Sequence, residues 1–385
     1  MRIDRIGEAT RLLDAFASRT GIDGGSGDPS HRYLWTDAFA LMASLGVAEG
    51  ANDLRHDVRA IRLANLVHRH LGRHRPDDAR TGWISGLPEA EGAVHPTAGG
   101  LRIGKPLPER RPGERYDARL EWQCDGQYFH YLTKWMHALH RLGLASGGAE
   151  WNRLGTELAV AAHAGFVVRP TPASRPRMHW KMSTDLTRVL VPSMGHLDPL
   201  DGLVAFATLR AEERRCRPGS TALDAPIDDM LRLCTDVQDW ATADPLGLGG
   251  LLAETAALVA LEGAGEVHAP GLAPRLIEAA ERGLRAFARG AEVTHEPGSR
   301  LAFRELGLVI GLRAWARHDP FIHYLPLADR IEATWLDPAS QLPAAWSGHR
   351  DINAVMLAAA LAPEAYIGSV PGALPRERWV RVAVA

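Results

Sequence analysis

Two kinds of apolar pattern alternate along the chain, and both have helical spacing. In the first kind, apolar residues recur every three or four positions and charged residues fill the opposite face, as in a helix at a protein surface. In the second kind, apolar residues surround the helix, which must then be buried in protein. The amphipathic segments begin at Ile3, Asp53, Ala149, Ile227, Leu272 and Phe321, and the apolar segments at Trp35, Gly126, Asp198, Asp244, Arg300 and Asp351. Because alternating β-branched runs are scarce, the pattern predicts an all-α protein.

Six outer and six inner helices in alternation predict six αα-hairpins closed into a double ring, an (α/α)6 toroid that forms a single domain over residues 1–385. The N-terminal amphipathic helix is expected to close the ring. Two insertions, residues 73–122 and 168–196, are rich in Pro, Gly and Arg, and each precedes an inner helix. Long loops in a compact domain are usually functional, and Trp122 and Trp180 are expected to anchor these two as buried aromatics. We therefore expect both insertions to lie over one mouth of the ring.

The composition argues against several classes of protein function. The chain carries a net charge of −2 with 46% apolar residues, so it has no field that attracts nucleic acid or anionic membrane. Cys124, Cys216 and Cys234 fit neither a disulfide framework nor a zinc spacing and are typical of free thiols in a reducing compartment. The N-terminus lacks the apolar core of a secretory signal, and we expect no apolar run to be long enough to span a bilayer. We expect a cytoplasmic protein without nucleic-acid or membrane partners.

Polar residues gather at the starts of the inner helices, which all run in one direction in such a ring and meet at one mouth. Asp198 and Asp244 each open an Asp-Pro-Leu stretch, and Asp followed by Pro is a common helix start. Asp244 is expected to be a helix cap alone. Asp198 is also expected to cap, but Asp201 follows one turn later on the same face and His196 precedes it, which exceeds what capping requires. Together with Asp125, at another inner helix start, these make the expected catalytic set: Asp125, His196, Asp198 and Asp201.

Further residues at the same mouth are candidates for substrate binding. Trp35, Tyr128 and Trp180 have amphipathic rings of the kind that stack on sugars, and Arg350 is able to clamp a carboxylate or phosphate. Structural alternatives stay open: helix capping for Asp37, loop anchoring for Trp180 and pairing with a neighbouring acid for Arg350. The expected substrate-binding residues are Trp35, Asp37, Tyr128, Trp180, Lys181, Glu305, His349, Arg350 and Asp351.

The sequence carries no signature of a cofactor or a metal site. It has no Gly-rich phosphate loop or dinucleotide fingerprint, and its GLGG stretch from Gly247 follows no predicted strand. His196 and Asp198 lack the spacing of a zinc site. We therefore expect neither a cofactor nor a metal.

Two stretches carry a resemblance to known proteins. They are DGQYFHYLTKWMHAL (residues 125–139) and VPSMGHLDPLDGL (residues 191–203). With the six-hairpin pattern, the chain resembles the six-hairpin glycosidase-like superfamily, and the two stretches look like motifs of a bacterial family within it. The resemblance implies a site at the mouth where the inner helices begin, because most members hydrolyse or epimerise sugars there.

Three hypotheses about function follow, all with a small-molecule carbohydrate as the partner. A glycoside hydrolase or lyase would use Asp125 with Asp198 or Asp201 as its two carboxyls, about 5 to 9.5 Å apart depending on mechanism. A sugar epimerase or isomerase would use His196 and His349 as bases on opposite faces of the substrate. A toroid that binds a sugar or a protein partner without catalysis is the third.

Overall fold

The structure is a computed structural model that describes residues 4–24, 26–169, 171, 174–290, 295–316 and 319–368. The predicted mostly helical fold is confirmed, since 16 α-helices make up 63% of it and the sheets are small. The helices are α1 Arg5–Arg19, α2 Leu34–Ala51, α3 Leu54–Leu71, α4 Glu89–Val94, α5 Ala118–Gln123, α6 Phe129–Ser146, α7 Ala149–Phe166, α8 Asp198–Cys216, α9 Asp224–Asp236, α10 Pro245–Gly263, α11 Leu272–Arg289, α12 Ala302–Arg313, α13 Leu325–Leu336, α14 Ala344–Ser347, α15 Arg350–Leu361 and α16 Glu364–Ile367.

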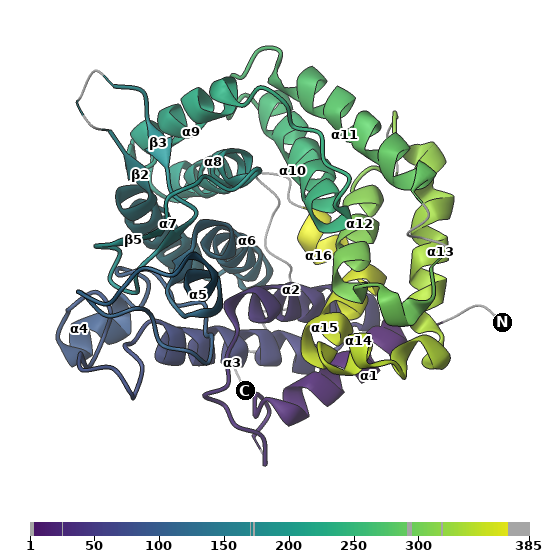
Figure 1. Cartoon of the computed structure of the whole chain (residues 1–385), viewed down its shortest axis with the longest axis horizontal. Helices are drawn as coiled ribbons and strands as arrows, with labels where there is room; N and C mark the ends of the chain where they lie inside the picture. Colours follow the sequence, from purple (N-terminus) through teal and green to yellow (C-terminus); the bar gives the residue numbers. More distant parts are fainter. Residues whose placement is uncertain are drawn as a thin grey trace.

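The long helices pack in outer and inner pairs. The outer helices α3, α7, α9, α11 and α13 contact the inner helices α2, α6, α8, α10 and α12 in that order, and α1 contacts α15. Each inner helix also contacts the next one, and α15 contacts α2. Figure 1 shows the inner helices around the centre, with the outer helices along the periphery. Each inner helix begins within three residues of its expected start.

Glycines allow two of the inner helices to pack unusually closely. A Cβ atom added at Gly249 of α10 would collide with the backbone oxygen of Gly307 on α12, and one added at Gly311 would collide with that of Gly249. The missing side chains therefore let the two backbones touch, which explains small residues inside these apolar helices.

One helix corrects the expectation that no apolar segment is long enough to span a bilayer. Among the described residues, Pro245–Gly263 has the length and hydropathy of a membrane span, although half of that window is buried inside the protein. Because α10 packs against α8, α11 and α12, its apolar surface is explained by a core position.

Short strands that the sequence patterns did not reveal lie directly before α6, at the start of the second insertion and within it. They are β1 Gln127–Tyr128, β2 Val167–Val168, β3 Arg177–Met178, β4 Lys181–Met182 and β5 Val189–Val191. All pairs are antiparallel, in one sheet of order β1-β4-β5 and another of β2 with β3. Strands of two or three residues are too short to show an alternating pattern. Residues 170, 172 and 173 of the second insertion lie outside the described residues.

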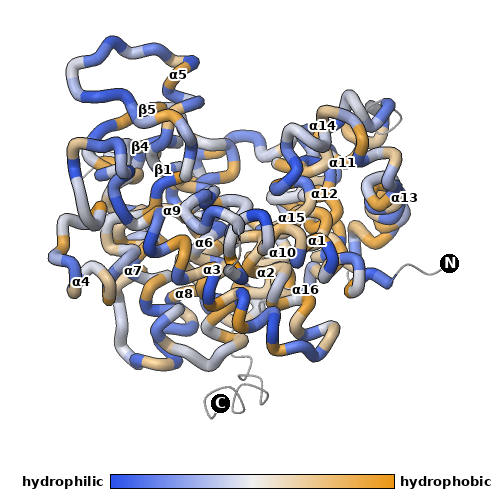
Figure 2. Tube along the Cα trace, turned by 90° about the horizontal axis from the view of Figure 1, so that it is seen from below, coloured by the Kyte–Doolittle hydropathy of each residue, from blue (hydrophilic) through white to orange (hydrophobic). Residues whose placement is uncertain are grey.

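The first sheet fixes the insertions beside the start of α6. The side-chain amide of Gln127 donates to the backbone oxygens of Gly99 and Thr184, which belong to different insertions, at 2.9 and 2.6 Å. Figure 2 shows α5 and β5 rising on one side of the molecule, and α14 and α11 on the other. The expected burial of both insertion tryptophans is wrong, since Trp122 is 39% exposed and Trp180 half-buried.

Candidate functional site

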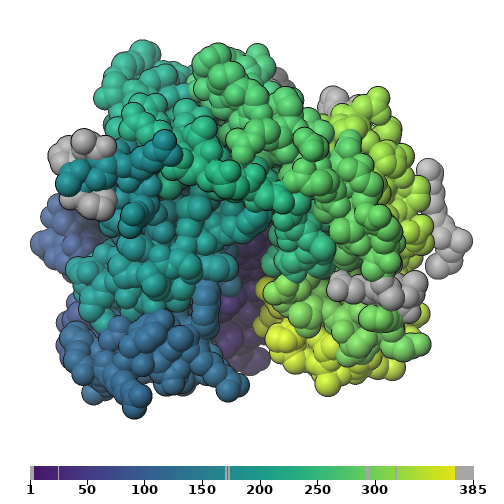
Figure 3. Space-filling model, turned by 45° about the horizontal axis from the view of Figure 1, so that its top comes forward, coloured from purple at the N-terminus to yellow at the C-terminus, as the bar shows by residue number. Residues whose placement is uncertain are grey.

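The starts of all six inner helices line one cavity of about 670 Å³. Figure 3 shows the hollow between the teal and blue part of the chain and its green and yellow part. The helices contribute Trp35 of α2, His130 of α6, Asp198 of α8, Leu246 of α10, Phe303 of α12 and Ile352 of α15. The insertions add Lys105, Trp122 and Trp180. The cavity therefore lies where the sequence analysis expects the mouth.

Asp198 is the most deeply buried acid of this cavity. Its residue is 2% exposed, and Oδ2 has no hydrogen-bond partner among the described residues. Burial, together with the negative charge of Asp201, raises the pKa of Asp198 well above its ordinary value. Gly195 makes room for it, because a Cβ atom there would collide with the Asp198 carboxyl. Burial thus favours the uncharged form of this carboxyl in the cavity wall.

Asp201 lies one turn further along α8 and has a charged partner. Its Oδ1 accepts a hydrogen bond of 3.2 Å from Nζ of Lys134, which also bonds the carboxylate of Glu254 on α10. Burial raises the pKa of Asp201 while Lys134 opposes the shift, and burial raises the pKa of Glu254 to about 7. The two acids on α8 therefore have different electrostatic surroundings.

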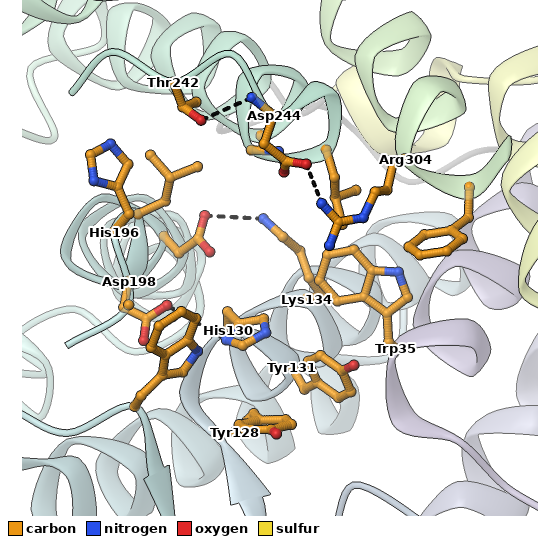
Figure 4. Close-up of a pocket in the computed structure, with 18 of the residues that line it drawn as sticks. Trp35, Tyr128, His130, Tyr131, Lys134, His196, Asp198, Thr242, Asp244 and Arg304 are labelled. Atoms are coloured by element: carbon orange, nitrogen blue, oxygen red, sulfur yellow. Dashed lines mark hydrogen bonds and ion pairs between the residues drawn. The ribbon is translucent and has the colours of Figure 1, made fainter. Parts of the chain in front are cut away.

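Aromatic rings form the part of the wall next to Asp198 (Figure 4). The His130 ring stacks on Tyr128 at 5.3 Å between centroids, and meets Trp35, Tyr131 and Trp180 edge-on. Burial lowers the pKa of His130 to about 3, so the ring is neutral near pH 7. Its Nδ1 lies 3.6 Å from Oδ1 of Asp198. The aromatic rings and the acids of α8 therefore lie side by side in the wall of the cavity.

Charged residues lie at the rim. Arg304 of α12 pairs with Asp244, whose side chain also accepts a 2.9 Å hydrogen bond from the backbone of Gly247. The predicted helix cap at Asp244 is confirmed, and it has the additional ion pair. Lys105 from the first insertion donates to the Tyr128 hydroxyl at 3.2 Å. Both cations face the cavity that the aromatic rings line.

No family model and no curated protein matches the chain.

The structure brings together six of the thirteen expected site residues in the cavity. These are Trp35, Tyr128, Trp180, His196, Asp198 and Asp201. One detail of the expectation is wrong: Asp198 is the first residue of α8, whose cap position is Leu197, and no side chain caps this helix.

Asp125 lies outside the cavity, contrary to expectation. It is fully buried, pairs with Arg102 at 2.6 Å and accepts a hydrogen bond from the backbone of Gly104 at 3.0 Å. Its carboxylate therefore fixes the first insertion to the start of α6. Lys181 has a similar structural position, because its buried Nζ donates to the backbone oxygens of Glu121 and Cys124. Burial lowers the pKa of Lys181 to about 8.

The remaining expected residues also have contacts outside the cavity. Asp37 is buried beside Arg32, and its carboxylate accepts from the backbone of Tyr33 at 3.1 Å, within the first turn of α2. Glu305 accepts two hydrogen bonds from Arg300, of 2.8 and 2.6 Å.

The last expected group lies at the start of α15. Asp351 pairs with Arg19 of α1 at 2.7 Å. His349 and Arg350 do not line the cavity. His196 does line it, with Nε2 3.1 Å from the backbone oxygen of Trp240. The two histidines of the epimerase hypothesis therefore do not meet in one site.

Sequence reasoning missed several residues of this cavity. The most important are His130, Tyr131, Lys134 and Arg304, with Glu254 behind Lys134. A signal for two of them is present in the sequence: His130 and Lys134 are four residues apart, on one face of a helix that is otherwise mostly apolar. Among the described residues, no group of three or more His, Cys, Asp or Glu side chains is arranged to hold a metal ion.

Proposed function

We propose that the chain is a carbohydrate-active enzyme, a glycoside hydrolase or lyase, built as an (α/α)6 toroid of the six-hairpin glycosidase-like kind. The observation that carries the proposal is the buried acid Asp198 beside aromatic rings in one cavity. The contacts that join each inner helix to the next and to an outer partner support the toroid.

Cleavage of a glycosidic bond requires a carboxylic acid that keeps its proton near neutral pH. Asp198 meets this requirement because burial and the neighbouring Asp201 raise its pKa. In the proposed hydrolysis, Asp198 donates its proton to the glycosidic oxygen as the bond from that oxygen to the anomeric carbon breaks. A second carboxyl then activates water or attacks the anomeric carbon. Asp201 is the nearest candidate along the helix.

The aromatic wall supports a sugar as the ligand. Sugar rings present apolar C–H faces that pack on indole and phenol rings, while their hydroxyls need polar partners. The cavity offers both: Trp35, Trp122 and Tyr128 as surfaces, and Lys105, Asp244 and Arg304 as polar groups. Its volume of about 670 Å³ is within the range of small-molecule sites.

A thermal-shift screen tests the proposal. The purified protein is heated with neutral sugars, uronic acids, amino sugars and short oligosaccharides. A ligand at about 100 times its dissociation constant stabilises the protein by roughly 2.7 kcal/mol, which corresponds to a shift of a few degrees. Sugars that bind are then incubated with the enzyme as their glycosides or oligomers, and the products are analysed.

Two variants complete the test. Asp198→Asn is expected to fold and to lose cleavage, whereas Asp228→Asn, at an exposed position of α9, is expected to retain it. Stabilisation by sugars without cleavage of any substrate would favour the binding-protein alternative. No stabilisation by any sugar would contradict the carbohydrate proposal.

A further inference from the structure

A buried lysine connects three inner helices in the wall of the cavity. Lys134 comes from α6, and its ammonium contacts Asp201 of α8 and Glu254 of α10. The side chains of Lys134 and Asp201 are each 6% exposed, and that of Glu254 is 12% exposed. Figure 4 shows the Lys134 side chain directed toward the acids of α8. One cation is thus shared by two carboxylates away from bulk water.

The groups around this cluster do not supply another contacting charge. His130 and His137 of α6 are neutral because burial lowers the pKa of each to about 3. Cys234 of α9 and Tyr366 of α16 are also uncharged near pH 7, because burial raises the pKa of each. Asp198 is the remaining acid that faces Asp201. The ammonium of Lys134 therefore decides which carboxyls can ionise.

Two carboxyls one turn apart compete for the same proton, because two negative charges in a buried site repel each other. Asp201 has a hydrogen-bonded ammonium. Asp198 has His130 at 3.6 Å, and this imidazole is neutral near pH 7. The contacts of the two acids thus differ in kind.

We propose that Lys134 is a positioning residue: its ammonium holds Asp201 as a carboxylate, so that Asp198 is the acid that keeps the proton, and Glu254 fixes Lys134 from the opposite side. The inference rests on the proposed function in giving these two states a catalytic use. Asp198 is then the proton donor, and Asp201 is the ionised group that activates water or attacks the sugar.

Carboxyl ¹³C NMR of protein labelled at its aspartate side chains tests the assignment without any substrate. The two resonances are assigned from Asp198→Asn and Asp201→Asn. In the wild-type protein, Asp201 is expected to titrate at lower pH than Asp198. In Lys134→Met, the Asp201 midpoint is expected to rise by about one pH unit or more, a tenfold gain in proton affinity.

Glu254→Gln is the matched variant. It removes the competing carboxylate from Lys134, and its amide can still donate the side-chain hydrogen bond that Glu254 makes to Asp201. The Asp201 midpoint is therefore expected to stay at its wild-type value or to fall. A general loosening of the site would instead move the midpoint in the same direction in both variants. This comparison separates an electrostatic role of Lys134 from a purely structural one.

The proposal is overturned by an Asp201 midpoint above that of Asp198 in the wild-type protein, by an unchanged midpoint in folded Lys134→Met, or by a rise in Glu254→Gln. If Lys134→Met does not fold, the wild-type order and Glu254→Gln decide. A protein that shows the expected titrations but binds no sugar would contradict the proposed function and leave the charge assignment standing.

Discussion

Oδ1 of Asp198 lies 3.6 Å from Nδ1 of His130, and burial shifts the pKa of both groups. Burial favours the neutral form of each, which means a protonated carboxyl and an unprotonated imidazole. Neither His130 Nδ1 nor Asp198 Oδ2 has a hydrogen-bond partner among the described residues. The two atoms can therefore hydrogen-bond a polar ligand. The protonation states of Asp198 and His130 affect the stability of the protein as well as its chemistry.

Asp198→Asn should make the protein less sensitive to rising pH. A carboxyl whose pKa is raised on folding contributes stability that is complete below the unfolded value of 3.8, and this stability is lost as pH rises toward the folded value. An amide resembles the protonated carboxyl and does not ionise. The stability of the variant relative to wild type should thus increase by about 1.4 kcal/mol per pH unit within that window.

Thermal unfolding at about pH 4.5 and about pH 7.5, both above the ordinary aspartate pKa of about 3.9, measures this difference. Asp228→Asn is the control and should follow the wild-type protein at both values. If Asp198→Asn also follows the wild type, Asp198 is ionised in the folded protein and its proposed role as an acid is wrong.

Buried histidines should make the protein sensitive to acid. Burial lowers the pKa of His68 to about 3 and that of His140 to about 4. A histidine whose pKa is lowered on folding contributes stability that is present above the unfolded pKa of 6.5. This stability is lost as pH falls toward the folded pKa. Each of these histidines then lowers the free energy of unfolding by about 1.4 kcal/mol for every pH unit below 6.5.

His68 offers a direct check, because its Nε2 accepts a hydrogen bond of 3.1 Å from the Trp135 indole. A His68→Gln variant keeps an acceptor in the side chain but cannot be protonated. Its free energy of unfolding should fall less than that of wild type between pH 6.5 and about pH 4.5, the fall scaling with the pH interval. The exposed His31→Gln serves as control. Equal slopes for all three proteins would show that His68 does not resist protonation.

Asp125→Ala should damage the fold, because its carboxylate neutralises the buried Arg102. Breaking a buried pair typically costs about 3–5 kcal/mol. Asp329→Ala removes the partner of Arg313 at a position where the aspartate side chain is 64% exposed, and exposed pairs contribute about 1 kcal/mol or less. Denaturant unfolding of both variants measures the difference. A loss of activity with unchanged stability in Asp125→Ala would restore a catalytic interpretation of this residue.

Asp125 and Asp198 illustrate how far the sequence could predict this site. Both acids precede or begin an inner helix, and the pattern of apolar residues placed those helix starts correctly to within three residues. The pattern could not show that Arg102, 23 residues earlier, lies against Asp125, because nothing in the spacing of an insertion predicts its tertiary contacts. It therefore treated a structural carboxylate and a cavity carboxylate alike.

The error at Lys134 is the opposite one, because a residue of the cavity was left out of the expected site. Its neighbours in the sequence, Thr133 and Trp135, are core residues of α6, and a lysine among them is easily assigned to an incidental position. Its partners Asp201 and Glu254 come from two other helices. A buried cation is recognised by its partners, and those are brought together by the packing of the helices rather than by any local pattern.

Gly249→Ala should destabilise the protein because the new methyl group would collide with the backbone of Gly307. Inserting a methyl group into a well-packed contact typically costs about 1–3 kcal/mol. Gly263→Ala is the matched control in the same helix, since a Cβ atom there meets nothing within 4 Å. It should be neutral or stabilising by up to about 1 kcal/mol. Denaturant unfolding compares them, and similar results for both would show that α10 and α12 lie further apart.

The aromatic wall of the cavity should contribute to sugar binding through Trp122. This residue lines the cavity and is 39% exposed, so its ring can be removed with little effect on the core. Tyr116 belongs to the same insertion and is 53% exposed, but it does not line the cavity. Loss of one aromatic contact costs about 0.5–1.5 kcal/mol of binding free energy, which raises the dissociation constant about two- to tenfold. Calorimetric titration with a sugar from the thermal-shift screen should therefore show weaker binding by Trp122→Ala and unchanged binding by Tyr116→Ala.

If both variants bind like wild type, the sugar does not contact the Trp122 ring, and the wall formed by Trp35 and Tyr128 must hold it alone. Equal losses in both would instead indicate that the insertion as a whole, and not a stacking surface, supports the site.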